Sequence, residues 1–521
     1  MQMTTSRPIS RLSQAVRNMG STIAVFVLNL GISYFLSPFI VKKLGVAAYG
    51  FLGLSNNIIG YTGLLTIALN SMAGRYVSLN YHAGNIEESN RYRTSTYFAN
   101  LFMAVVLVVV LGVFTIFMEK IVNIPPQQVS DVKLLFVLLF INAAIGLATS
   151  LYGYATFIKN RLDLTNTRIL VGTVIRTALT VIAFGFFPAE LWYMGGIAII
   201  ISFYNIYTSY RFHRLLTPEL KIRRRHYDFK CVKEMTMAGI WNLLTSLSSM
   251  LSHGLDLLLS NVFISAYFMG VVSLSKSIPW LILGLFASLA NTFHPEYMEF
   301  YAQKNMDKLK ETLLRSIRIL GLFTAIPCSI LFSYGDLFYT LWLPAGQDIG
   351  LIYRLTCITM TGIIVTLPTQ ALWYIFTMTN KVKQSSLNLI KFGIVNVTLI
   401  VIAMHFINSD LYKVYALVTI QASVMFVRFI CWLPSYGAKV LGLPRFTLLR
   451  PTLLILLSTA ILTMVSLTIK NFLIHQYSWG ALIGASVVTT LTGIVINYGL
   501  SLTEADRLFI KTRILKIQRP K

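Results

Sequence analysis

Four basic side chains interrupt otherwise apolar stretches of the sequence: Arg176, Lys276, Arg354 and Lys391. A charge inside a membrane-spanning segment is costly, so it usually faces a water-filled cavity or an internal partner. A cation in such a cavity offsets the desolvation of an anion, and the forked donors of Arg match phosphate especially well. We predict that these four cations bind an anionic substrate. The structural alternative is a buried ion pair, or a side chain that snorkels to the membrane surface.

His253 and Asp256 lie three residues apart in an apolar stretch, which places them on one face of a helix. Intramembrane carboxylates and histidines carry protons or ions in transporters, so this pair is a candidate coupling-ion site for H+ or Na+. Asp256 and Asp336 are also candidate salt-bridge partners of Arg354, which would make their role structural. Both interpretations stay open. We expect no other cofactor and no metal site.

The elements that position these residues are predicted to be transmembrane helices. Hydrophobic residues make up 55% of the chain and charged residues 12%, about half the ~25% charged share of soluble domains. The apolar runs are continuous and about 20 residues long, which is typical of spanning helices and not of the alternating strands of a barrel. We predict an all-α polytopic membrane protein with fourteen spans, at 20–41, 49–74, 96–118, 133–155, 168–187, 191–210, 236–260, 265–292, 316–342, 350–377, 385–407, 411–434, 449–473 and 479–502.

The net charge of +25 indicates how the chain is oriented across the membrane. Most of the 44 Lys and Arg residues fall in loops on one side of this topology, and both chain ends lie on that side. The positive-inside rule therefore predicts that both termini are cytoplasmic. The central run "KIRRRHYDF" fits the anionic lipid head groups of that surface better than nucleic acid.

An internal repeat is visible when the sequence is shifted by 220 residues. Identical pairs include Gly50/Gly270, Leu54/Leu274, Ser55/Ser275, Tyr81/Tyr301 and Asn160/Asn380. We predict two parallel six-helix repeats, an arrangement that places a substrate site between the two halves. The predicted parts are an N-terminal lobe 1–210, a basic linker 211–235, a C-terminal lobe 236–440, two extra helices within 441–503 and a basic tail 504–521.

Five asparagines lie in the spans that we expect at the interface of the two halves: Asn29, Asn57, Asn70, Asn242 and Asn291. Their amides are suited to sugar hydroxyls, although hydrogen bonding between neighbouring helices is the commoner use. The sequence has no phosphate-binding Gly-rich loop, no His-Glu metal motif and no nucleophile elbow, so we do not expect an enzyme. The four cysteines show no spacing pattern.

The region from Pro38 to Arg93 resembles a known family. It places Pro38 in the first predicted span, Leu44-Gly45 at its outer end, Tyr49-Gly50 at the start of the second span and a polar loop from Arg75. This pattern, with the layout of six, six and two spans, resembles the polysaccharide-biosynthesis (Wzx-type) flippases. These belong to the multidrug/oligosaccharidyl-lipid/polysaccharide (MOP) exporter superfamily.

The resemblance implies a V-shaped, MATE-like transporter of the bacterial or archaeal cytoplasmic (inner) membrane. It would flip a polyisoprenyl-diphosphate-linked oligosaccharide, the repeat unit of an O-antigen, capsule or exopolysaccharide, by alternating access. Expected partners are this lipid-linked oligosaccharide, membrane lipids and other polysaccharide-assembly proteins, and no nucleic acid.

Three alternatives stay open. A lipid II flippase shares the fold and span count. A MATE-type multidrug or cation antiporter would favour acidic cavity residues over the basic ones seen here. A polymerase or membrane glycosyltransferase would be expected to show a large outer loop.

Overall fold

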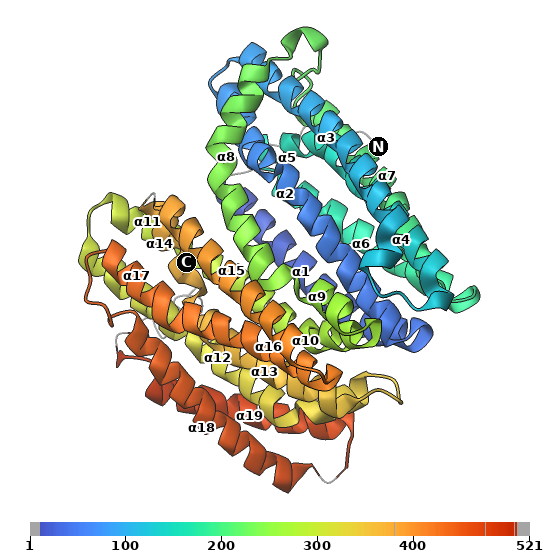
Figure 1. The fold of residues 1–521 in the computed structure, drawn as a ribbon. Coiled ribbons are helices and arrows are strands. Elements are labelled where there is room, and N and C mark those ends of the chain that lie inside the picture. Colours follow the sequence, from blue (N-terminus) through green and yellow to red (C-terminus); the bar gives the residue numbers. More distant parts are fainter. Residues whose placement is uncertain (1–10, 380, 475, 505, 508–521) are drawn as a thin grey trace. The chain divides into compact units, whose positions relative to one another are not determined.

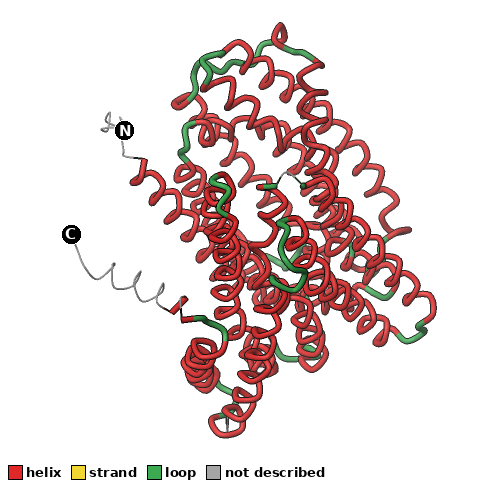
Figure 2. Tube along the Cα trace, turned by 90° about the vertical axis from the view of Figure 1, so that its left-hand side faces the viewer, coloured by secondary structure: helices red, strands yellow, loops and turns green. Residues whose placement is uncertain are grey.

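The structure, a computed structural model, describes residues 11–379, 381–474, 476–504 and 506–507. Throughout these residues the secondary structure is helical, with short loops and no strand (Figure 2). Residues 1–10 and most of the predicted basic tail, 508–521, lie outside the described residues.

The helices are as follows. The first seven are α1 (Arg11–Leu44), α2 (Val46–His82), α3 (Ile86–Ile121), α4 (Val129–Thr149), α5 (Tyr154–Ile158), α6 (Leu162–Phe186) and α7 (Trp192–Leu216). They are followed by α8 (Phe229–Ser249), α9 (Asp256–Phe263), α10 (Ala266–Ala290), α11 (His294–Ala302), α12 (Met306–Trp342), α13 (Ile349–Thr369), α14 (Tyr374–Met378), α15 (Val382–Phe406), α16 (Asp410–Val427), α17 (Leu433–Val440), α18 (Leu449–Leu473) and α19 (Trp479–Leu500). Short helical turns interrupt or connect these helices. They include the π-helical turns η4 (Met250–Gly254) and η7 (Arg428–Trp432) and the 3-10 turns η2 (Ser150–Gly153) and η6 (Gln370–Trp373).

The predicted repeat is confirmed by the helix boundaries. Shifting α4 by 220 residues gives the bounds of α13, and shifting α6 gives the bounds of α15. The caps repeat as well: Asn85 accepts a hydrogen bond from the Glu88 N–H at the start of α3, and Asn305 accepts one from the Lys308 N–H at the start of α12. An asparagine cap satisfies a free N–H of the first turn, so the same local chemistry begins the equivalent helix in both copies.

The first compact unit comprises residues 1–250 and 257–270. In it α1 packs on α6, α6 on α7, α7 on α4, α4 on α3, α3 on α2 and α2 on α8 (Figure 1). Gly239 of α8 permits the last of these contacts, because a Cβ there would lie 1.8 Å from the carbonyl oxygen of Ala68. Leu69, Val77 and Met235 are buried beside this crossing.

The second compact unit comprises residues 251–256 and 271–521. Its α15, α16, α13 and α12 pack in the same order as their counterparts α6, α7, α4 and α3. Helices α18 and α19 have no counterpart in the repeat and pack on α12 (Figure 1). There the buried hydroxyl of Tyr334 donates to the Ser466 carbonyl at 3.0 Å, and Gly321 leaves room for Ile455.

The basic segment 211–235 is held against α3. The Asn90 side-chain oxygen accepts a hydrogen bond from the Lys221 N–H at 2.8 Å, and the Ser95 hydroxyl accepts one from the Asp228 N–H at 2.9 Å. Asp228 also forms an ion pair with Arg91. A hydrogen bond from a backbone N–H in the first turn of α8, together with Arg91, lowers the pKa of the Asp228 carboxyl.

Eleven helical segments among the described residues are long and apolar enough to cross a membrane, and a bent α2 raises this number to twelve. The chain is therefore a multi-pass membrane protein. The predicted number of fourteen spans is not confirmed. The predicted spans 191–210 and 236–260 fall on α7 and on the stretch from α8 to α9, which are not among the eleven. Both stretches are rich in Ser, Asn and other polar side chains, which lowers their apolar content.

Candidate functional site

A buried polar cluster lies within the second unit, where η4 meets α10, α15, α16 and η7. The π-helical turn η4 shifts backbone groups out of the usual α-helical ladder. The Ser252 carbonyl of this turn accepts hydrogen bonds from the side-chain amides of Gln421, at 2.9 Å, and Asn396, at 3.4 Å. The irregular turn is thus satisfied by two amides from helices that are distant in sequence.

Lys276 and Asp256 form an ion pair in this cluster. Both residues are only 5% exposed, and the Lys276 ammonium also donates to the side-chain oxygen of Gln421. In an apolar interior such a pair is retained because each charge neutralises the other. The structure therefore places Lys276, predicted as a cavity cation, in the buried ion pair that was its structural alternative.

Arg428 is the second cation of the cluster, and it has no acidic partner within salt-bridge distance among the described residues. Its side chain is 8% exposed. One guanidinium nitrogen donates to the Ser252 hydroxyl at 3.3 Å, and the guanidinium lies over the rings of Trp373 and Phe429, at 5.5 and 4.9 Å. Its Nε has no hydrogen-bond partner among the residues that the structure describes. Cation–π contact offsets part of the cost of burial, but it does not neutralise the charge.

The sequence reasoning missed Arg428, because it counted this residue among the cytoplasmic cations. A detectable signal was present, since Arg428 stands inside the predicted span 411–434. Its partner Ser252 is 176 positions away in the chain, and the sequence alone did not link the two.

Two acceptor atoms of the same cluster are buried and have no hydrogen-bond partner within the described part of the chain: Asp256 Oδ1 and Asn396 Oδ1. The ring of His253, the other predicted coupling residue, packs edge-on against Trp280 at 5.4 Å. The structure thus brings His253, Asp256 and Lys276 into one region of the second unit. Unpaired acceptor oxygens are the groups that a proton or a hard cation would bind.

The remaining predicted cations are exposed. Arg176 stands fourteen residues after the start of α6 and ten before its end. Arg354 donates to the Gly350 carbonyl of its own helix at 3.1 Å. Asp336 binds Lys470 of α18 at 2.7 Å, so in the described structure neither Asp336 nor Asp256 pairs with Arg354.

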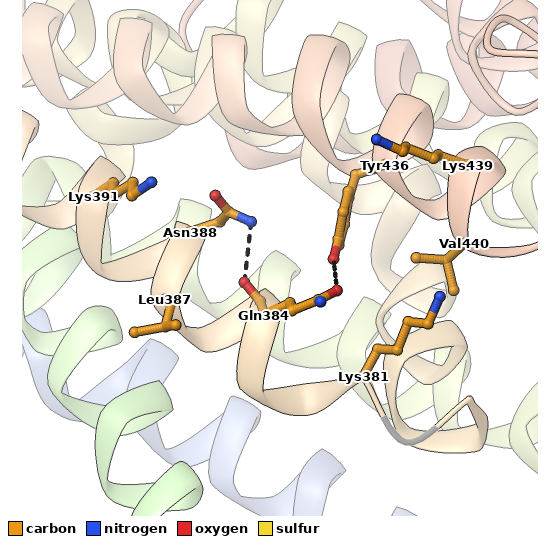
Figure 3. Close-up of a pocket in the computed structure, with 8 residues that line it drawn as sticks. All are labelled: Lys381, Gln384, Leu387, Asn388, Lys391, Tyr436, Lys439 and Val440. Carbon is orange, nitrogen blue, oxygen red and sulfur yellow. Dashed lines mark hydrogen bonds between the residues drawn. The ribbon is translucent and has the colours of Figure 1, made fainter.

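Lys391 lines a pocket of about 540 Å³ between α15 and α17 (Figure 3). The α15–α17 pocket is lined by Lys381, Gln384, Leu387, Asn388, Lys391, Tyr436, Lys439 and Val440. The Tyr436 hydroxyl donates to the Gln384 side-chain oxygen at 2.6 Å and connects the two walls.

Three of the predicted asparagines form hydrogen bonds between helices. Asn70 of α2 bonds with Asn100 of α3 at 2.9 Å, Asn242 of α8 donates to Ser71 of α2 at 3.1 Å, and Asn291 accepts from the Tyr374 hydroxyl. Asn29 is exposed and Asn57 is half-buried. The structure therefore gives Asn70, Asn242 and Asn291 the role that is commoner for asparagine in membrane helices.

Comparison with solved structures shows which proteins share this fold. The inward-facing conformation of a multidrug resistance MATE family transporter of the MOP superfamily matches with a TM-score of 0.66 and 14% identity, over 80% of this chain and 98% of that one. The outward-facing conformation matches with a TM-score of 0.56 and 14% identity, over 82% and 96%. The chain has a MATE-like transporter fold. The predicted all-α, MATE-like fold class is confirmed, apart from the count of fourteen spans.

Two further proteins are similar to this chain, one in structure and one in sequence. A MOP superfamily transporter from Pyrococcus furiosus, described as having a binding pocket of reverse polarity that suggests a different function, matches with a TM-score of 0.55 and 14% identity, over 82% of this chain and 96% of that one. The uncharacterized membrane protein EpsK of Bacillus subtilis is 27% identical over 507 residues, which cover 96% of this chain and 98% of EpsK. No family model matches the sequence.

Proposed function

We propose that the protein flips a polyisoprenyl-diphosphate-linked oligosaccharide across a bacterial or archaeal cytoplasmic membrane by alternating access, with both termini cytoplasmic. The MATE-like fold supports a transporter. The resemblance of the region from Pro38 to Arg93 to Wzx-type flippases supports the saccharide carrier as substrate. Membrane lipids and other polysaccharide-assembly proteins are the partners proposed with it. A lipid II flippase would use the same lipid diphosphate chemistry and belongs to the same proposal.

The uncompensated charge of Arg428 is the observation that carries the proposal. Lys276 and Asp256 neutralise each other, so Arg428 leaves the polar cluster with an excess positive charge. A desolvated guanidinium with a free Nε is suited to a phosphate group, because two phosphate oxygens can each accept one of two parallel hydrogen bonds from it. A site for an organic cation would need the opposite balance, with carboxylates in excess.

A coupling ion fits the same cluster. The unpaired oxygens of Asp256 and Asn396 offer acceptors for H+ or Na+ beside the Lys276 ammonium. Binding an ion there would compete with Lys276 for Asp256 and change the packing of the π-helical turn η4. This observation favours ion-coupled transport, and it is also what a MATE-type cation antiporter would use.

The proposal is tested with the full-length protein in lipid vesicles. The substrate is a polyprenyl-diphosphate-linked disaccharide with a fluorescent tag, whose transfer between leaflets is followed by its protection from a membrane-impermeant quencher. We expect protein-dependent transfer of this lipid, and no transfer of the matched polyprenyl glycoside that lacks the diphosphate. Equal transfer of both lipids, or transport of an organic cation such as ethidium with no transfer of the lipid, would contradict the proposal.

A further inference from the structure

The α15–α17 pocket concentrates positive charge. Figure 3 shows Lys381 directly before α15, Lys391 on α15 and Lys439 on α17, with Lys391 on one side of the hydrogen bond between Gln384 and Tyr436 and the other two lysines on the opposite side. All three lysines are exposed, and the residues that line the pocket include no Asp or Glu. None of the three has a carboxylate within salt-bridge distance in the part of the chain that the structure describes. Three like charges around one hollow repel each other unless an anion binds between them.

The pocket also offers hydrogen-bonding groups that suit an anion. Helix α15 begins directly after Lys381. The positive end of the helix dipole therefore adds to the field of the lysines. On the α15 side of the pocket, the Asn388 side-chain amide donates to the backbone carbonyl of Gln384 at 3.0 Å. The built-in polar groups thus favour a compact oxyanion such as a phosphate.

An apolar groove adjoins the pocket. It has a volume of about 800 Å³ and shares Tyr436 and Lys439 with the pocket. Its other walls are mainly apolar or aromatic, and they include Phe392, Val427 and Trp432. The rings of Trp432 and Tyr436 are stacked at 5.4 Å with an interplanar angle of 15°. A basic pocket that continues into an apolar, aromatic groove is complementary to an amphiphile with a phosphate at one end.

We propose that the α15–α17 pocket binds the phosphate group of a membrane lipid, with Lys381, Lys391 and Lys439 as its counter-ions and the lipid chain in the adjoining groove. Two lipids carry this chemistry: an anionic phospholipid, and the polyprenyl diphosphate of the proposed substrate. In the second case the pocket would receive the carrier, and that part of the inference rests on the proposed function.

Binding is measured on the full-length protein in detergent by native mass spectrometry. The probes are geranylgeranyl diphosphate, short-chain phosphatidylglycerol and uncharged geranylgeraniol. The pocket variant is Lys381→Gln/Lys391→Gln/Lys439→Gln. The matched control, Lys304→Gln/Lys308→Gln/Lys310→Gln, removes the same charge from the region where α11 is linked to α12, outside the pocket. Thermal unfolding of both variants checks that they remain folded.

We expect the pocket variant to bind the phosphate-bearing probes about a hundredfold more weakly than the wild type. Each of the three lysines attracts the lipid phosphate, and the three contributions to the binding free energy are comparable and add together. The control variant should bind them like the wild type, and geranylgeraniol should bind weakly to all three proteins. A loss confined to the diphosphate assigns the pocket to the carrier, and a loss for phosphatidylglycerol as well assigns it to lipid phosphates in general. Unchanged binding by the pocket variant, or an equal loss in the control, would overturn the proposal.

Transfer assays on the same variants separate this inference from the proposed function. If the wild type transfers no lipid-linked saccharide but the pocket variant still loses phosphate binding, the proposed function fails and the lipid site stands. If the wild type transfers the saccharide and the pocket variant binds all probes normally, the lipid site fails and the proposed function stands.

Discussion

The two repeats share several helix boundaries but differ in their polar interiors. In the first unit the hydrogen-bonded network that joins α2, α3 and η2 is neutral: Asn70 bonds with Asn100, and Asn100 bonds with Ser150 of η2. In the second unit the polar cluster is charged, with Lys276 paired to Asp256. When the two copies are aligned with a shift of 220 residues, Lys276 corresponds to Asn56, which is exposed. The buried cation of the first unit, Arg93, contacts the Leu220 carbonyl and His213 instead, so the copies differ in which part of the interior carries charge and in how that charge is paired.

A backbone irregularity accompanies this difference. The second copy contains the π-helical turn η4, whereas α1 runs as an uninterrupted α-helix through the equivalent residues 30–34. The π-helical turn exposes the Ser252 carbonyl to Gln421 and Asn396, and the Ser252 hydroxyl accepts from Arg428. π-helical turns often occur at functional sites because they aim backbone groups outside the regular ladder. The π-helical turn and the Lys276–Asp256 pair therefore distinguish the polar cluster of the second unit from the equivalent region of the first.

The largest effect is expected from breaking the charged pair. Asp256→Asn leaves the Lys276 ammonium buried without a counter-ion, which should cost about 3–5 kcal/mol of stability. The measurement is the apparent melting temperature of the purified protein in detergent. The double variant Asp256→Leu/Lys276→Met should recover most of the loss, because an apolar pair needs no neutralisation. The control Asp336→Asn removes a half-buried pair and should cost at most about 1 kcal/mol. Equal melting temperatures for the two single variants would contradict this account.

The next largest effect is a difference in stability between two glycine substitutions, one at a helix contact in each unit. In Gly239→Ala the new Cβ would meet the Ala68 carbonyl at 1.8 Å, so α8 must move away from α2 at a cost of about 2 kcal/mol. In Gly321→Ala the Cβ would meet only the side chain of Ile455, at 2.1 Å. That side chain can change rotamer, and the gain in helix propensity of about 1 kcal/mol offsets the strain. Thermal unfolding of the two variants should therefore differ clearly, and the reverse order would show that the obstacle at Gly239 is not rigid.

A smaller loss is expected in the neutral network of the first unit. Asn100→Ala leaves the Asn70 and Ser150 side chains without this partner, which should cost about 1–2 kcal/mol. The melting temperature of this variant should lie between those of the wild type and Asp256→Asn. A loss as large as that of Asp256→Asn would remove the distinction between this neutral network and the charged cluster of the second unit.

The smallest effect is a pH dependence in the first unit. Burial and the nearby Arg93 guanidinium lower the pKa of His213 from 6.5 to about 4. The folded state therefore resists a proton that the unfolded chain accepts, so this contribution to stability is present above pH 6.5 and is lost as the pH falls towards 4. His213→Gln should flatten the decline in melting temperature over that interval. An unchanged decline would show that other groups dominate it.

The sequence predicts the scaffold well and the site only in part. Continuous apolar runs and the 220-residue repeat predict the helices, because helix boundaries depend on local composition and caps such as Asn85. The cluster depends instead on contacts between distant helices. Lys276 and Gln421 are 145 positions apart, and a π-helical turn has no sequence pattern that we could read. Lys276 was therefore predicted without its partner Gln421, and Arg428 was missed.

We propose that Arg428 receives an anionic group of the transported lipid, and the decisive measurement is transfer of the polyprenyl-diphosphate-linked disaccharide by Arg428→Gln. Arg450→Gln, which removes an exposed cation at the start of α18, is the matched control. We expect Arg428→Gln to slow transfer by on the order of a hundredfold, while the control transfers the lipid like the wild type and both variants remain folded. Transfer by Arg428→Gln at the wild-type rate would contradict it.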